Sequence, residues 1–161
     1  MDAANCDLTC DILVVGAGPA GAAAARSAAE KGADVLLVER RAVVGEPVQC
    51  AEFIPAMLKG QVNLPNTSKS KFIAQKVKGM KTFRPGQPET VTKAPGYIID
   101  RNRFDQALVE AARSQGAKVM TSTRAVDRSE DGVVTLRAGQ GGSLTVKPEI
   151  VIGADGPHSI T

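Results

Sequence analysis

The sequence feature that most constrains this chain is a glycine-rich turn between two apolar segments, DILVVGAGPAGAAAARSAAEKGADVLLVER, residues 11–40. Residues 11–15 are apolar and rich in β-branched side chains, which predicts a buried strand. Pro19 to Lys31 is predicted to be a helix, with proline in its first turn and Gly32 after its end. Residues 33–40 are predicted to be a second buried strand. This order predicts a βαβ unit with two parallel strands and a right-handed crossover.

The turn inside this unit has the pattern G-x-G-x-x-G, formed by Gly16, Gly18 and Gly21. The first glycine permits a tight turn, the second lets the backbone approach a pyrophosphate, and the third lets the helix pack on the strand. The pyrophosphate is expected at the helix N-terminus, where free N–H groups and the dipole attract an anion. The alternative is that these glycines only make a turn.

An acidic residue, Glu39, ends the second predicted strand. A carboxylate at this position accepts hydrogen bonds from a ribose 2′-hydroxyl and repels a 2′-phosphate. The site is therefore expected to bind FAD or NAD rather than NADP, although the neighbouring Arg40 and Arg41 weaken the repulsion. The local motif does not decide between FAD and NAD.

The rest of the chain alternates between irregular and regular segments. Residues 41–98 are proline-rich and weakly periodic, which predicts an excursion with its own short elements. A helix is expected from Asn102 until Gly116 stops it, followed by a strand at 117–123. The three short alternating segments that follow, RAVDR, GVVTLRAG and GSLTVKP, predict a three-stranded antiparallel meander. A last buried strand is expected at 149–156.

Charge and composition exclude several classes of function. Ten Lys and Arg stand against only Glu89 and Asp100 between Leu58 and Arg103. A solvated surface is the commoner reason for such a run, and attraction to phosphate groups of a substrate, a second nucleotide or a lipid surface is the alternative. Scarce aromatic residues disfavour nucleic acid. Three cysteines and one histidine do not make a zinc site, so no metal is expected.

Targeting signals are absent from the sequence as given. No apolar run approaches the ~20 residues that a membrane span needs. The N-terminal MDAANCDLTC lacks a secretory pattern. We therefore expect a cytoplasmic protein, with peripheral membrane contact through the basic 58–103 segment as an option.

Three further motifs carry a resemblance to a known family: GEPVQCAE at 45–52, IDRNRFDQALVEAARSQGAKV at 99–119 and VIGADGPHS at 151–159. Together with the glycine turn they resemble FAD-dependent oxidoreductases of the glutathione-reductase-like group, above all the geranylgeranyl reductase family. The resemblance implies a Rossmann-like α/β domain over 1–161, with a flexible tail at 1–10. It implies FAD as cofactor, NAD(P)H or another electron donor, and reduction of C=C bonds in isoprenoid or related lipid substrates.

The resemblance also implies which residues contact the cofactor. The glycine turn would hold the pyrophosphate and Glu39 the adenosine ribose, while Ala125 or Val126 would contact the adenine through backbone. Cys50 and Ala51 would lie beside the flavin or its ribityl chain. The full set is Gly16, Gly18, Ala20, Gly21, Glu39, Arg40, Cys50, Ala51, Arg101, Ala125, Val126, Asp155 and Gly156. Three of these have structural alternatives. A free cysteine such as Cys50 is usually a small buried residue, and Asp155 suits a turn cap. Arg101 and Arg103 flank a helix start, and one of the two is expected to be only solvated.

Two other functions fit parts of the sequence. An FAD-dependent monooxygenase of the aromatic-hydroxylase type would share the glycine turn, Glu39 and GADG, but GEPVQCAE favours the reductase. A non-catalytic dinucleotide-binding fragment would suit the short length. By resemblance the chain is the N-terminal portion of a longer flavoprotein whose substrate domain is largely absent, so no catalytic residue is identified and an incomplete active site is expected. Phe53 departs from the family, which often has a small residue or glycine near this point.

Overall fold

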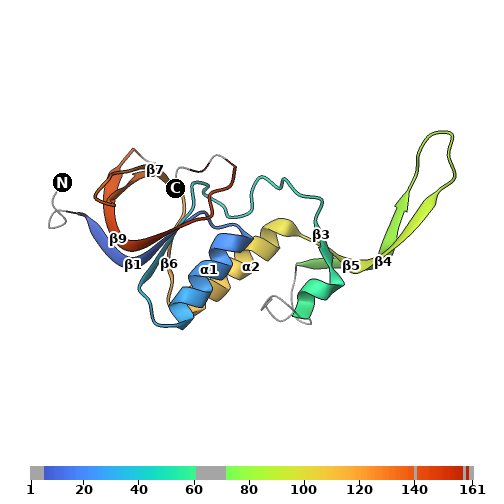
Figure 1. The fold of residues 1–161 in the computed structure, drawn as a ribbon, viewed down its shortest axis with the longest axis horizontal. Helices are drawn as coiled ribbons and strands as arrows, with labels where there is room; N and C mark the ends of the chain where they lie inside the picture. The colour runs from blue at the N-terminus through green and yellow to red at the C-terminus, as the bar shows by residue number, and fades with distance from the viewer. Residues whose placement is uncertain (1–5, 61–71, 140, 158, 160–161) are drawn as a thin grey trace. The chain divides into compact units, whose positions relative to one another are not determined.

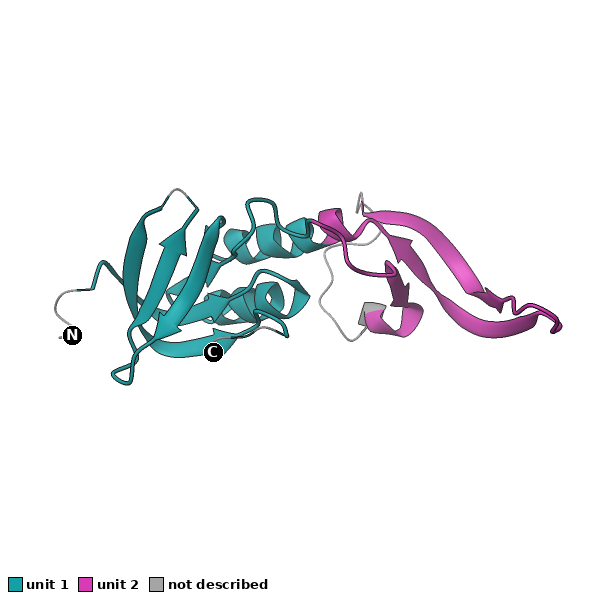
Figure 2. Ribbon diagram, turned by 90° about the horizontal axis from the view of Figure 1, so that it is seen from above, with its two compact units in different colours: residues 1–46, 105–161 teal, residues 47–104 magenta. Residues whose placement is uncertain are grey.

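The computed structural model describes residues 6–60, 72–139, 141–157 and 159. The chain divides into two compact units, one formed by residues 1–46 and 105–161 and the other by residues 47–104 (Figure 2). We call them unit 1 and unit 2, as in the figure, and describe each by itself.

Unit 1 is built on a six-stranded sheet with the strand order β6-β2-β1-β9-β8-β7 (Figure 1). The strands β6, β2, β1 and β9 are parallel, whereas β8 and β7 continue the sheet antiparallel. Their bounds are Leu8–Val15 for β1, Val35–Val38 for β2, Lys118–Met120 for β6, Thr123–Arg128 for β7, Val134–Ala138 for β8 and Ser143–Gly153 for β9. The predicted α/β class, with a parallel sheet and an antiparallel meander, is confirmed.

The predicted βαβ unit is formed by β1, α1 (Pro19–Glu30) and β2. All four residues of β2 are buried, and so are Leu13 and Val14 in β1. The helix α1 packs on these strands through small side chains, with Gly21, Ala22, Ala25 and Ala29 buried. Because these residues carry at most a methyl group, the helix axis can approach the sheet closely, which positions the turn before it.

Three boundaries differ from the sequence prediction. The strand β1 begins at Leu8, inside the predicted 1–10 tail, because Leu8 pairs with Val146 on β9. The predicted strands before and after Pro148 are one strand, β9. Proline is tolerated there because the ladder with β8 ends at Val146, which leaves one edge of β9 open. The strand β6 ends at Met120, before Ser122 takes a left-handed φ of 51°.

Unit 2 holds a three-stranded antiparallel sheet with the order β3-β5-β4. Its elements are β3 (Phe53–Pro55), the 3₁₀ helix η2 (Ala56–Gly60), β4 (Ile73–Thr82) and β5 (Thr90–Ile99). We call β4, β5 and their connection, residues 73–99, the ribbon. Most of its side chains are exposed on both faces, and residues 61–71 of the predicted basic segment lie outside the described residues. The predicted excursion, 41–98, overlaps most of this unit.

The second helix, α2 (Arg101–Ser114), begins in unit 2 and continues in unit 1. It starts one residue before the predicted Asn102 and stops before Gly116, whose φ is +101°. Near its start the ring of Phe104 meets the ring of Phe72 edge-on, with 5.1 Å between centroids. In the described part of the chain, no helix combines the length and apolarity needed to cross a bilayer.

Candidate dinucleotide-binding site

Gly16 makes the turn out of β1 and cannot be replaced without a clash. Its φ is +100°, a left-handed conformation that favours glycine. A Cβ built there would lie 2.4 Å from the carbonyl oxygen of Ala154. The N–H of Gly16 donates to the carbonyl of Val38 at 2.8 Å, which ties the turn to the end of β2. The positive φ and the close approach of Ala154 therefore require glycine at position 16, with or without a ligand.

Gly21 is required for a different reason, the close approach of α1 to the turn. A Cβ at this position would lie 1.8 Å from the carbonyl oxygen of Gly16 and 3.2 Å from the Cβ of Ala154. Any side chain at residue 21 would push the helix away from the turn. This is the packing role that the sequence motif assigns to its third glycine.

Gly18 differs from both, because no contact among the described residues explains why glycine is needed there. Its φ of −68° and ψ of −179° are open to any residue. A Cβ built there would meet no described atom within 4 Å. The missing side chain leaves open space beside the backbone, which is what a ligand approaching the turn requires. The residues present therefore fit a pyrophosphate at this turn.

The N-terminus of α1 also fits an anion. Gly18 is its N-cap and gives no side-chain hydrogen bond, and Pro19 has no N–H to be satisfied. The first turn carries no acidic residue. The partial positive charge of the helix end is therefore not offset by an acid of its own first turn, and it can stabilise a bound phosphate.

Hydrogen bonds at both carboxylate oxygens hold the Glu39 side chain beside the glycine turn. Its Oε2 accepts from the N–H of Ala17 at 2.9 Å, and its Oε1 accepts from the N–H of Arg41 at 3.0 Å. Its backbone N–H donates to Met120 and its carbonyl accepts from Thr123. Each carboxylate oxygen keeps a second lone pair, so the group can still accept from ribose hydroxyls. Arg40, the next residue, is exposed.

Asp155 and Gly156 lie at the same edge of the sheet as the glycine turn. The N–H of Ala154 donates to the carbonyl of Val15 at 2.8 Å, so the end of β9 follows the end of β1. A Cβ at Gly16 would lie 3.0 Å from the Cα of Asp155. Gly156 has a left-handed φ of +82°. The structure thus brings the glycine turn, Glu39 and Asp155 together from segments that are far apart in sequence.

Ala125 and Val126 lie on β7, which forms one edge of the sheet. The Ala125 side chain is buried in the core, and the pairing with β8 shifts register between Ala125 and Asp127. Val126 therefore has no partner in that ladder. Because the outer side of β7 pairs with no described strand, its backbone could still meet an adenine ring, and this role stays a prediction.

Unit 2 carries the remaining predicted residues, Cys50, Ala51 and Arg101. Cys50 and Ala51 are exposed, so the alternative that Cys50 is a small buried residue is wrong. Arg101 is the first residue of α2 and is half-buried. Their roles toward a cofactor stay predictions.

Sequence reasoning missed Glu52, which links two of these residues. Its φ is +57°, unusual for a residue with a side chain. Its Oε1 accepts from the N–H of Arg101 at 2.9 Å, and its own N–H donates to the Cys50 sulfur at 3.4 Å. No local pattern signals this, because the helix that Glu52 caps begins 49 residues later.

The bulky Phe53, noted as a departure from the family, is accommodated by a glycine on the neighbouring strand. A Cβ at Gly96 would lie 2.4 Å from the Cε2 atom of Phe53 and 2.5 Å from the carbonyl oxygen of Ile54. The ring therefore lies against Gly96 of the central strand β5, where the glycine leaves room for it. Phe53 itself stays 38% exposed.

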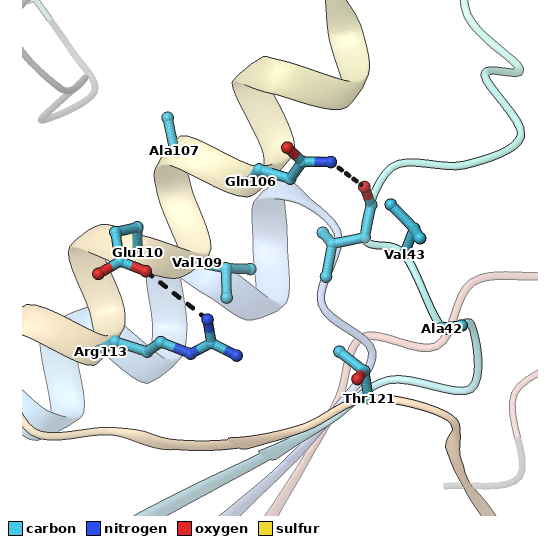
Figure 3. A pocket seen from close by; sticks show the side chains of 9 residues that line it. Ala42, Val43, Gln106, Ala107, Val109, Glu110, Arg113 and Thr121 are labelled. Carbon is cyan, nitrogen blue, oxygen red and sulfur yellow. Dashed lines mark hydrogen bonds and ion pairs between the residues drawn. The ribbon is translucent and has the colours of Figure 1, made fainter. Parts of the chain in front are cut away.

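A separate pocket of about 540 Å³ lies between α2 and the segment after β2 in unit 1 (Figure 3). The side chain of Gln106 donates to the carbonyl of Val44 at 3.3 Å, and Arg113 pairs with Glu110 at 3.6 Å. Its lining includes none of the residues predicted to bind the cofactor. Among the described residues, no cluster of His, Cys, Asp or Glu could hold a metal ion.

The sequence model of the FAD dependent oxidoreductase family matches residues 11–156. The chain belongs to the FAD-dependent oxidoreductase family. Similar proteins also confirm the predicted resemblance to the geranylgeranyl reductase family. A digeranylgeranylglycerophospholipid reductase of Methanothrix thermoacetophila is 40% identical, over 94% of this chain and 40% of the relative. A protein of Methanosarcina barkeri, described as an uncharacterized protein in the nifH2 5′ region, is 37% identical over 93% of this chain and 84% of its own length.

Solved structures show the same likeness. A geranylgeranyl bacteriochlorophyll reductase-like protein of Thermoplasma acidophilum is 31% identical with a TM-score of 0.82, over 92% of this chain and 40% of that protein. The myxobacterial chondrochloren halogenase CndH, with a TM-score of 0.75, is 21% identical over 95% of this chain and 38% of that protein, which shows a shared fold. The chain spans about two fifths of the length of the named reductases.

Proposed function

We propose that this chain binds FAD at the glycine turn of unit 1 and belongs to an enzyme that reduces C=C bonds in isoprenoid or related lipid substrates. The observation that carries the proposal is the open space at Gly18. No contact in the described part of the chain requires glycine there, whereas close contacts do require it at Gly16 and Gly21. The family match supports FAD, and the names of the reductase relatives support the lipid substrate class.

Each residue of unit 1 has a defined task in this proposal. The backbone from Gly16 to Gly21, including Ala20, binds the pyrophosphate, and Glu39 binds the adenosine ribose. The backbone of Ala125 or Val126 contacts the adenine, and Arg40 lies next to the ribose. Asp155 and Gly156 approach the pyrophosphate from β9. Isoalloxazine supplies hydride chemistry when FAD is bound, and the protein contributes binding, orientation and electrostatics.

The residues of unit 2 are proposed to serve the flavin end. Cys50 and Ala51 would lie beside the flavin or its ribityl chain, and Arg101 would reach the cofactor with its guanidinium group. NAD(P)H or another donor would reduce the flavin. Anaerobic bleaching of the flavin absorbance by NADH or NADPH tests the donor, and bound flavin that neither donor bleaches would exclude NAD(P)H.

The cofactor proposal is tested by titrating the apo-protein with FAD and following flavin fluorescence. Glu39→Gln leaves one carbonyl oxygen for two N–H donors and a ribose, so FAD affinity should fall by about tenfold. Glu30→Gln, at the exposed end of α1, is the matched control and should bind like the wild type. Equal affinities for Glu39→Gln and wild type would contradict the assignment of Glu39 to the ribose.

Lipid substrates also suggest contact with an anionic membrane surface through the ribbon. Lys81 pairs in register with Val91, and Gly79 pairs with Lys93, so both lysines lie on one face. Met80 pairs with Thr92 on the opposite face, which is uncharged at these positions. Lys81 forms an ion pair with Glu89 of the same ribbon, with 3.1 Å between Nζ and Oε1. A cationic face of this kind is attracted to anionic lipids.

Charge reversal tests the membrane contact. Lys76, Lys78 and Lys81 changed together to Glu should weaken binding to phosphatidylserine vesicles by about a hundredfold, because each lysine near such a surface contributes about 1 kcal/mol. Vesicles of phosphatidylcholine alone are the control and should bind neither protein. Unchanged binding to the anionic vesicles would contradict this part of the proposal.

A further inference from the structure

We propose that Glu52 is a positioning residue that fastens the loop carrying Cys50 and Ala51 to the start of α2, where Arg101 lies. The carboxylate of Glu52 accepts from the Arg101 N–H at 2.9 Å, and the backbone N–H of Glu52 donates to the Cys50 sulfur at 3.4 Å. A third hydrogen bond runs from the Ile99 N–H to the Glu52 carbonyl at 2.8 Å. One residue thus contacts both segments that carry the predicted flavin-side residues of unit 2.

The backbone of Glu52 is held in an unfavourable conformation. A φ of +57° is left-handed, a conformation that is strained for a residue with a Cβ. The sheet restrains this conformation on the C-terminal side of Glu52, because the next residue, Phe53, pairs with Ile98 on β5. Such a conformation persists only where the surroundings determine it, and glycine would adopt it without strain. The side chain of Glu52 must therefore contribute something that glycine cannot.

That contribution is a carboxylate at the N-terminus of α2. The first turn of this helix has no acidic residue and instead carries Arg101 and Arg103, whose charges oppose the helix dipole. Asp100 offers a local cap, with its Oδ1 3.5 Å from the Arg103 N–H and an ion pair to the Arg103 side chain at 3.1 Å. Glu52 adds a second carboxylate from a distant segment. Of these two carboxylates, the one of Glu52 connects the Cys50 loop to the helix.

The consequence is a fixed spacing between the loop and the helix start. If Glu52 lost its carboxylate, the 2.9 Å hydrogen bond between this loop and the Arg101 N–H would be lost. The positions of Cys50, Ala51 and Arg101 relative to one another would then vary. This inference rests on the proposed function, because those three residues are the ones assigned to the flavin end.

The test compares Glu52→Ala with Glu52→Gln and with Asp100→Ala, the matched control at the same helix end. Amide hydrogen exchange is measured by NMR on the flavin-free protein, at Arg101 and at residues 50–53. Glu52→Ala should raise these exchange rates by about tenfold. Glu52→Gln keeps a carbonyl acceptor and should stay within about threefold of the wild type. Asp100→Ala should leave the exchange of residues 50–53 within about threefold.

FAD affinity is measured on the same variants. Glu52→Ala should weaken FAD binding by about tenfold, with Glu52→Gln restoring most of it and Asp100→Ala near wild type. The inference is overturned if Glu52→Ala and Asp100→Ala act alike, since Glu52 would then be only a helix cap. Faster exchange without weaker FAD binding also overturns it. A wild-type protein that does not bind FAD would overturn the proposed function instead, and the exchange result, obtained without flavin, separates the two failures.

Discussion

The two units of this chain differ in how their predicted cofactor residues are supported. In unit 1 the glycine turn lies on strands with fully buried side chains, such as Leu13 and Leu37. In unit 2 the ribbon exposes most of its side chains, with Met80 and Val91 about 60% exposed. The largest side chains that are fully buried all belong to unit 1 among the described residues.

The difference shows two ways of placing a binding residue. In unit 1 the placement follows from the core, because the strand ends and the helix N-terminus meet at one edge of the sheet. In unit 2 the placement depends on single polar contacts, such as the one between Glu52 and Arg101. Most side chains of β4 and β5 are exposed, so unit 2 buries less apolar surface that could hold a loop in position.

The largest expected effect tests the packing contrast itself. Leu13→Ala, in the fully buried part of β1, should lower the free energy of unfolding by about 3–4 kcal/mol. Met80→Ala, a truncation of similar size on the exposed ribbon, should change it by less than about 0.5 kcal/mol. Urea denaturation measures both. Comparable losses would mean that the ribbon is packed and that the contrast is wrong.

The second effect concerns the turn. Gly21→Ala places a methyl group 1.8 Å from the Gly16 carbonyl oxygen, so α1 must shift. We expect a loss of about 3 kcal/mol in the free energy of unfolding, as for other overpacked sites. Thermal unfolding followed by circular dichroism provides the measurement. A variant as stable as the wild type would show that the close approach of α1 to the turn does not exist.

A smaller effect separates binding from folding. Gly18→Ala adds a methyl group where no described atom lies within 4 Å, so stability should change by less than about 1 kcal/mol. FAD affinity should fall by about tenfold, because the methyl group occupies the space assigned to the pyrophosphate. Isothermal titration with FAD measures the affinity. If Gly18→Ala bound FAD with wild-type affinity, the ligand would not occupy the open space at Gly18.

The smallest effect is a pH dependence at the start of β1. The carboxylate of Asp7 accepts from the N–H and hydroxyl of Thr145, both at 2.8 Å, and these bonds lower the pKa of Asp7 below its ordinary value of 3.8. A lowered folded pKa stabilises the protein above pH 3.8, and the stabilisation disappears as the pH falls through the folded value. Asp7→Asn should therefore narrow the difference in melting temperature between pH 6 and about pH 3. An unchanged difference would contradict the role of Asp7.

Prediction from sequence was most accurate where structure is local. The strand, turn and helix from residue 11 to Glu30 follow from periodicity and from glycine and proline signals, and they were predicted nearly to their bounds. The extension of β1 back to Leu8 was missed, because it depends on pairing with β9, far along the chain. Pro148 suggested a strand break that the open edge of β9 makes unnecessary.

The same limit applies to the candidate site. The residues of the glycine turn, Glu39 and Asp155 were all singled out from motifs, and the structure brings them to one sheet edge. Glu52 could not be found in this way, because its partner Arg101 is distant in sequence and its left-handed φ normally signals glycine or asparagine. Contacts between segments, rather than motifs within them, were what the sequence did not reveal.

The central claim is that the turn from Gly16 to Gly21, with Glu39, forms an FAD site. The most direct test is the visible spectrum of the purified chain after incubation with FAD and removal of free flavin, with the mass of any released cofactor determined. The account predicts a flavin spectrum and a released mass equal to that of FAD. A folded chain that stays colourless, or one that retains NAD instead, would contradict it.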